Sequence, residues 1–151
     1  MLKRLMGAAV LLLVPVCGDA LTLDRIIVSR TQDGPPADGQ FIGGDRVFIR
    51  VEATNFERKE GTADLSQDVV IEAPFGITMV NQKNAGGVSF ERPLDPSSPA
   101  TLTSVFQFPN GPQGTWKIRI TVNDKVAGSA ATQSATVELM KNRTPVPLVQ
   151  P

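Results

Sequence analysis

Residues 115–123 read Thr-Trp-Lys-Ile-Arg-Ile-Thr-Val-Asn, with an apolar side chain at every second position. Successive side chains of a β-strand point to opposite faces of the sheet. One face would carry Trp116, Ile118, Ile120 and Val122, and the other would carry Lys117, Arg119 and Thr121. This pattern predicts a strand in the centre of a sheet, buried on one side.

The segment that follows repeats the pattern after a turn. Residues 123–128 read Asn-Asp-Lys-Val-Ala-Gly, which are turn formers. Residues 129–140 then alternate again and place four apolar side chains on one face: Ala131, Ala135, Val137 and Leu139. Two alternating segments joined by a short turn predict an antiparallel hairpin.

The rest of the chain also favours strands, because no segment from Leu21 onward has apolar residues at helical spacing. Further strands are expected at residues 21–29, 46–53, 68–73, 76–82, 88–92 and 100–108, and Pro74 marks a turn or an edge. Seven or eight short strands with turn residues between them predict an all-β fold, a single antiparallel β-sandwich. The expected domain spans residues 21–141, and a Pro-rich extended tail spans residues 142–151.

Residues 111–124 read Gly-Pro-Gln-Gly-Thr-Trp-Lys-Ile-Arg-Ile-Thr-Val-Asn-Asp. This segment resembles the late-strand motif of bacterial immunoglobulin-like and fibronectin type III-like modules, in which a Pro/Gly corner leads into Gly-x-Tyr, alternating apolar residues and an Asp-containing turn. The resemblance implies an immunoglobulin-like sandwich and says almost nothing about function. Trp116 stands where the family usually has Tyr, so its indole N–H has to find an acceptor of its own.

Residues 1–20 predict a cleavable secretory signal peptide. Lys3 and Arg4 precede an apolar run at residues 5–16, and small residues suit cleavage after Ala20, with Gly18 as a second choice. The run is shorter than the roughly 20 residues that a membrane-spanning helix needs. We therefore expect an exported protein that does not span the membrane.

The single cysteine, Cys17, lies inside this leader and raises one alternative. A bacterial lipoprotein carries its lipid on a cysteine at such a position, but the bulky Val16 fits that motif poorly, so a lipid anchor is the less favoured interpretation. A mature chain without cysteine forms no disulfide, which favours a bacterial periplasmic or secreted protein over a eukaryotic one.

Composition excludes several function classes. The chain has 15 Lys+Arg, 15 Asp+Glu and no His, and its formal net charge is zero. Without a basic cluster we expect no nucleic-acid binding. Without histidine the chain cannot build Ser-His-Asp, Cys-His or histidine–metal chemistry. The protein is therefore not expected to be an enzyme or to need a cofactor, although a site made of carboxylates alone stays open as the least favoured alternative.

Two groups of residues could bind a ligand. Trp116 and the seven Phe residues could stack on a polysaccharide, but Trp116 shares a face with three apolar residues and is expected in the core. Phe48 faces the opposite way from its apolar neighbours and is expected either exposed or beneath the opening segment. The Asp33–Asp45 loop could supply carboxylates to calcium, but it matches no calcium-loop spacing, so a surface loop is favoured over a metal site.

Two polar segments are candidates for contact with a partner protein. Residues 55–64 are the most densely charged part of the chain and include Arg58 and Lys59. Residues 84–87, which begin with Asn84, are expected to be a flexible connection. Both would be solvated loops, available for recognition.

These observations favour an exported, non-catalytic β-sandwich that acts as a binding or accessory subunit of a bacterial cell-envelope system. Its partner would be another envelope or secreted protein, bound by the loops at Arg58, Lys59 and Asn84 or by pairing along an edge strand. The alternative is a module that binds polysaccharide or calcium, and a proteinase inhibitor also stays open.

Overall fold

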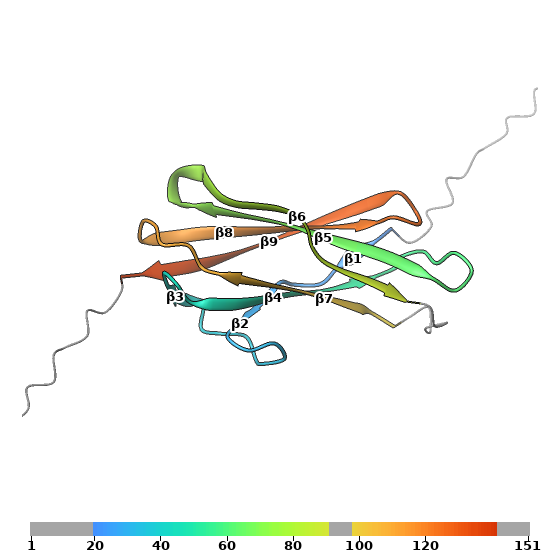
Figure 1. Cartoon of the computed structure of the whole chain (residues 1–151), viewed down its shortest axis with the longest axis horizontal. Coiled ribbons are helices and arrows are strands. Elements are labelled where there is room, and N and C mark those ends of the chain that lie inside the picture. The colour runs from blue at the N-terminus through green and yellow to red at the C-terminus, as the bar shows by residue number, and fades with distance from the viewer. Residues whose placement is uncertain (1–19, 91–97, 142–151) are drawn as a thin grey trace, which may run out of the picture.

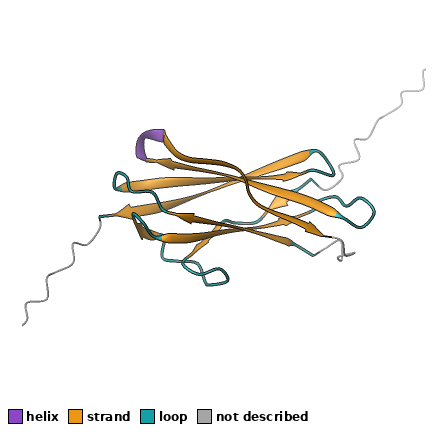
Figure 2. Ribbon diagram, in the orientation of Figure 1, coloured by secondary structure: helices purple, strands orange, loops and turns teal. Residues whose placement is uncertain are grey.

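The computed structural model describes residues 20–90 and 98–141. Within these residues the protein is all-β, with nine strands and one short 3-10 turn arranged as two layers (Figures 1 and 2). The elements are β1 (Thr22–Leu23), β2 (Ile27–Ser29), β3 (Gln40–Ile42), β4 (Arg46–Thr54), β5 (Ala63–Ala73), η1 (Pro74–Gly76), β6 (Ile77–Phe90), β7 (Ala100–Gln107), β8 (Gly114–Asp124) and β9 (Ser129–Met140).

The strands form two sheets that enclose one core. In the smaller sheet β4 pairs with β7 on one side and with both β1 and β2 on the other. The larger sheet has the order β3-β9-β8-β5-β6. The prediction of a β-sandwich is confirmed, and β8 is the central strand of the larger sheet, as the alternation at residues 115–123 predicted.

One sheet is mixed, so the prediction of a purely antiparallel sandwich is wrong in that respect. β3 runs parallel to β9, whereas the other paired strands of the described residues are antiparallel. The cause is a crossing of the chain between layers. After β2 it leaves the smaller sheet, adds three residues to the outer side of β9, and returns through the turn at Gly43 and Gly44 to form β4.

The core lies between the two sheets and has an aromatic cluster at one end. Trp116, Ile118, Ile120 and Val122 of β8 are fully buried, and alternate residues of β4 and β7 face them. The ring of Phe108 stacks on Phe41, with centroids 5.8 Å apart, and meets Trp116 edge-on at 5.2 Å. Trp116 is therefore part of the core, as predicted, and is not a surface stacking platform.

The indole N–H of Trp116 finds its acceptor four residues upstream. Nε1 donates to the carbonyl oxygen of Pro112 at 2.9 Å, which ties the corner before β8 to the strand itself. The indole also lies so close to Gly111 that a Cβ there would come within 2.7 Å of the ring. The corner thus requires both the glycine and the hydrogen-bonding aromatic residue.

Several predicted boundaries differ from the structure. The expected opening strand at residues 21–29 is split into β1 and β2, because the chain leaves the edge of β4 after Leu23. Residues 84–87 are not a flexible connection: they lie inside β6, which continues to Phe90. The predicted signal peptide up to residue 19, with Cys17, and the tail at residues 142–151 lie outside the described residues. Among the described residues, no helix is long and apolar enough to cross a membrane.

Candidate functional site

The loop between β4 and β5 ends in a tight turn rather than an open, solvated coil. The backbone of Lys59 and that of Thr62 exchange two hydrogen bonds of 2.9 Å. Between them Glu60 and Gly61 both have positive φ, at 53° and 80°. Two successive residues with positive φ between paired neighbours are typical of a type I′ hairpin turn, which holds its side chains in fixed directions.

A buried carboxylate anchors this loop to the neighbouring turn. Asp124, at the end of β8, is 1% exposed. Its Oδ2 accepts a hydrogen bond from the Glu57 N–H at 2.8 Å, and its Oδ1 accepts from Val126 N–H at 3.0 Å and Ala127 N–H at 3.1 Å. One side chain therefore fixes two loops at the same end of the sandwich.

The predicted contact residues Arg58 and Lys59 both lie in this anchored loop. The guanidinium of Arg58 lies 5.1 Å from the ring centroid of Phe56, and Phe56 in turn packs on the core. Lys59 is exposed. The interpretation of residues 55–64 as one solvated loop is wrong at its end, since Ala63 and Asp64 belong to β5 and Ala63 is fully buried.

Asn84, the third predicted contact residue, lies at an irregularity in the middle of β6. Its φ is 52°, and its N–H donates to Oδ1 of Asp68 at 2.9 Å. Oδ2 of Asp68 also receives Asn123 Nδ2 at 3.1 Å and Lys83 Nζ at 3.4 Å. Burial raises the pKa of the Asp68 carboxyl, but the hydrogen bonds from Asn84 and Asn123 and the Lys83 cation outweigh it and hold the pKa below its ordinary value of 3.8.

The structure does not bring these predicted residues together. The loop with Arg58 and Lys59 joins β5 at Ala63, whereas Asn84 is bound to Asp68, five residues further along that strand. At the rise of a β-strand, Ala63 and Asp68 lie about 17 Å apart along β5. Asn84 lies within strand β6, whereas residues 55–62 form a loop, so the anchored loop at residues 55–62 is the better candidate surface.

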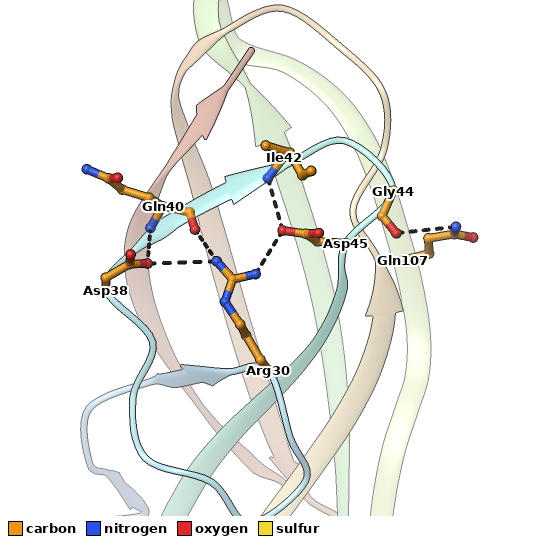
Figure 3. Close-up of polar contacts among 7 residues, drawn as sticks. All are labelled: Arg30, Asp38, Gln40, Ile42, Gly44, Asp45 and Gln107. Atoms are coloured by element: carbon orange, nitrogen blue, oxygen red, sulfur yellow. Dashed lines mark hydrogen bonds and ion pairs between the residues drawn. The ribbon is translucent and has the colours of Figure 1, made fainter. Parts of the chain in front are cut away.

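The Asp33–Asp45 segment uses its carboxylates to cover a strand edge (Figure 3). Gly39 turns its carbonyl toward β9, so the main-chain groups of Gln40 and Ile42 face outward. The Gln40 N–H donates to Asp38, the Gln40 carbonyl accepts from Arg30, and the Ile42 N–H donates to Asp45. Side chains thus occupy the outer edge of β3.

Arg30 joins these groups into one network. Its Nη1 lies 2.9 Å from Asp45 Oδ2, and its Nη2 lies 3.9 Å from Asp38 Oδ1. A surface pocket of about 510 Å³ opens beside it, toward Met140 and Lys141 at the end of β9. Within residues 20–90 and 98–141, no group of three or more acidic, His or Cys side chains gathers as a metal site would require.

Phe48 lies on the outer face of the smaller sheet, half-buried, with the guanidinium of Arg46 5.4 Å from its ring centroid. Its Cα is paired with that of Ser29 in β2 on one side. Phe48 therefore lies beside β2 in the same sheet and is half-buried, not exposed as one of the two expected positions required.

Sequence reasoning missed an exposed apolar tip between β5 and β6. Phe75 is 95% exposed and has a φ of 69°, and Ile77 and Met79 are 53% and 40% exposed. The signal was present in the sequence as an aromatic residue inside the turn Pro74-Phe75-Gly76, where a polar residue is usual.

Comparisons with known proteins support the fold alone. No family model matches the chain, and no curated protein matches it. An alkylpurine DNA glycosylase of Pseudomonas fluorescens, solved with DNA containing an abasic site analog, is 12% identical, with a TM-score of 0.50 over 79% of this chain and 30% of that one. A family 123 glycoside hydrolase of Clostridium perfringens is 10% identical, with a TM-score of 0.51 over 83% of this chain and 28% of that one.

This chain spans less than a third of the length of each of those two proteins. At such low sequence identity the structural similarity is evidence for the architecture and not for the activity. The chain is thus an all-β, two-sheet domain that resembles β-sandwich domains of multidomain proteins.

Proposed function

We propose that this protein is an exported, non-catalytic immunoglobulin-like domain that serves as a binding or accessory subunit of a bacterial cell-envelope system. It acts in the periplasm or after secretion, by contact with another envelope or secreted protein. The contact surface is the anchored loop at residues 55–62, with Arg58 and Lys59 as its cationic side chains.

The observation that carries the proposal is the preorganisation of this loop. Asp124 accepts the Glu57 N–H, Phe56 packs on the core, and a two-residue turn fixes Lys59 opposite Thr62. A surface loop that is ordered before binding loses less conformational entropy when a partner docks. Charged side chains on such a loop give specificity and steer the encounter.

The immunoglobulin-like part of the proposal is supported by the strand order. In immunoglobulin domains the strands named C, F and G form one sheet, and an additional C′ strand extends it beside C. The run β9-β8-β5-β6 follows the order G-F-C-C′, and the neighbouring β4 and β7 follow B and E of the other sheet. The ring–carbonyl hydrogen bond of Trp116 supports the same comparison, because it ties the corner before β8 as the Tyr of such modules ties theirs.

The non-catalytic part is supported by composition. The chain has no histidine, and its one cysteine belongs to the segment expected to be removed on export. Export is supported by the leader pattern of residues 1–20.

The test is affinity capture of the protein from a native envelope extract after mild cross-linking, with partners identified by mass spectrometry. We expect a reproducible protein partner that is lost from the double variant Arg58→Glu, Lys59→Glu. The matched control is Lys117→Glu, Lys141→Glu, which makes the same change in charge at two exposed lysines away from the loop.

Equal capture by both double variants would contradict the proposed surface, and the absence of any partner would contradict the proposed function. In the second case a screen of glycans and calcium would test the ligand-binding alternative. The mass of the N-terminal peptide from the same sample distinguishes a start at Leu21 from a lipid-modified Cys17.

A further inference from the structure

The sheets of this sandwich have four outer edges, and three of them are closed within the described residues. Side chains of Arg30, Asp38 and Asp45 occupy the outward groups of β3. The edge opposite β7 is divided between β1 and β2, which have two and three residues. Short or covered edges are the usual protection against pairing with another chain.

The edge of β7 is closed by the second half of β6. That half bends toward the smaller sheet after Asn84, and a Cβ at Gly86 would lie only 2.8 Å from the carbonyl oxygen of Thr103 in β7. The second half of β6 therefore lies against β7 at Thr103 and covers its edge there.

The fourth edge, the first half of β6 from Ile77 to Lys83, stays open. Alternate residues of an outer strand turn their N–H and C=O groups away from the neighbouring strand. In the described part of the chain these groups of Ile77–Lys83 have no hydrogen-bond partner on the side away from β5. Met79 has no partner on β5 either, since the register shifts there, which leaves its half-exposed side chain available.

The tip beside this edge has a conformation that its own packing does not explain. Phe75 is a bulky residue in the left-handed region, which costs energy and favours glycine or asparagine. At 95% exposure its ring gains almost nothing from burial in the folded chain. A contact outside the chain would bury this ring and offset the strain.

The charge pattern allows a second copy of this chain to meet the open edge. Residues 73–82 carry no charged side chain, and the flanking Glu72 and Lys83 are neutralised by Arg119 and Asp68. Two copies of this segment can therefore meet without opposing like charges.

We propose that β6 is the interface of a homodimer, in which the open edges of two copies pair antiparallel about a two-fold axis. The pairing joins the two larger sheets into one, and the apolar tip of each copy packs against the other copy. Because the other edges are closed, one such pairing uses the open edge of both copies and the assembly stops at two. The capped edge of β3, at the opposite side of the same sheet, prevents a third copy from adding there. This proposal does not depend on the proposed function, since it uses another surface.

The test is sedimentation velocity of the protein produced from the full chain, at concentrations from about 1 µM to about 1 mM, a range that spans weak to moderate affinities. We expect a shift from monomer to dimer and no larger species. The double variant Ile77→Lys, Met79→Lys should raise the dimer dissociation constant about tenfold or more, because it sets cations at an apolar contact. The matched control Val105→Lys, at a residue 46% exposed on β7, should leave the dimer unchanged.

Hydrogen exchange of the unmodified protein provides a readout that needs no variant to fold. Amide protection in residues 77–83 should rise with protein concentration, and protection in the loop at residues 55–62 should not. Two results of sedimentation would overturn the proposal: a protein that stays monomeric up to the highest concentration, or an assembly larger than two. The proposal would also be overturned if only the Val105→Lys control lost the dimer, or if concentration-dependent protection appeared only outside residues 77–83.

Discussion

Replacement of Asp124 by Asn removes one of its three hydrogen bonds while it keeps the other two. The Asn oxygen can take the place of Oδ1 and still accept from Val126 and Ala127, but the amide nitrogen that replaces Oδ2 cannot accept from the Glu57 N–H. A hydrogen bond to a charged group contributes about 1.5–3 kcal/mol. We therefore expect Asp124→Asn to lower the free energy of unfolding by about 2 kcal/mol.

Asp124→Ala removes all three bonds and leaves a small cavity at a site that is 1% exposed. The three N–H donors are only partly buried, so water replaces part of what is lost, and we expect a total near 4 kcal/mol instead of three times the single bond. With a urea m-value of about 2 kcal/mol per M, the unfolding midpoint should fall by about 1 M for Asp124→Asn and about 2 M for Asp124→Ala. Asp24→Asn is the matched control, because the Asp24 side chain is exposed and, among the described residues, accepts only from the adjacent Arg25 N–H, so its effect should stay within about 0.5 kcal/mol.

Amide exchange distinguishes the loss of the loop anchor from a general loss of stability. In Asp124→Asn the Glu57 amide should exchange faster while the Val126 and Ala127 amides stay protected, and in Asp124→Ala all three should exchange faster. Equal stability of the two variants, or an unchanged Glu57 amide in Asp124→Asn, would refute the view that this carboxylate anchors the loop. Because the anchored loop is the proposed contact surface, Asp124→Asn should weaken partner capture although it leaves Arg58 and Lys59 unchanged.

Three further predictions concern buried or paired side chains. The pKa of Asp68 is below 3.8 in the folded protein, so its carboxylate stabilises the fold above that pH and loses this contribution as the pH falls through the folded pKa. The stability difference between the protein and Asp68→Asn, measured by urea unfolding, should therefore be constant from about pH 5 to 7 and shrink at about pH 3. A stability difference that does not change with pH would contradict this prediction. Trp116→Phe should lower the free energy of unfolding by about 2–3 kcal/mol, since it removes the hydrogen bond to Pro112 and part of a fully buried ring. Unfolding has to be followed by circular dichroism because the chain has one tryptophan. An unchanged free energy of unfolding would mean that this hydrogen bond does not stabilise the corner before β8. Gln67 is fully buried, and neither polar atom of its side-chain amide has a hydrogen-bond partner among the described residues. Gln67→Met should therefore raise the free energy of unfolding by about 1–3 kcal/mol. A decrease in thermal or urea stability would mean that the amide makes hydrogen bonds in the folded protein.

Strict alternation over eight or more residues was enough to predict β4, β7, β8 and β9 from the sequence. One face is buried along β4, β7 and β8 and at Val137 and Leu139 of β9, so the register follows from which side chains are apolar. The position of Trp116 in the core and the hairpin of β8 and β9 follow from that pattern and are confirmed.

The same reasoning fails where side chains are small or the strand is short. Residues 84–87 contain Asn and two glycines, which are typical of turns. The structure instead has Asp68 accepting a hydrogen bond from the Asn84 N–H, which keeps the segment in the sheet. β3 has three residues between Gly-rich turns, too few for any period, and its parallel pairing depends on β9 almost a hundred residues later. The bond between Asp124 and Glu57 likewise spans 67 residues, so no local pattern could reveal that a residue of turn type anchors a distant loop.

Three aspartates of the described chain serve one purpose, which bears on whether acidic residues could form an enzyme site. Asp45 accepts the Ile42 N–H at the edge of β3, Asp68 accepts the Asn84 N–H at the irregularity in β6, and Asp124 accepts three N–H groups at the end of β8. Each carboxylate satisfies backbone donors where the regular ladder is interrupted, and such donors are costly to leave unpaired. The hydrogen bonds to Asp68 hold its pKa below the ordinary value, which is opposite to the raised pKa that a general acid needs at neutral pH. The three aspartates hold a strand edge, an irregular strand and a loop in fixed positions, which is what the proposed binding function requires of them.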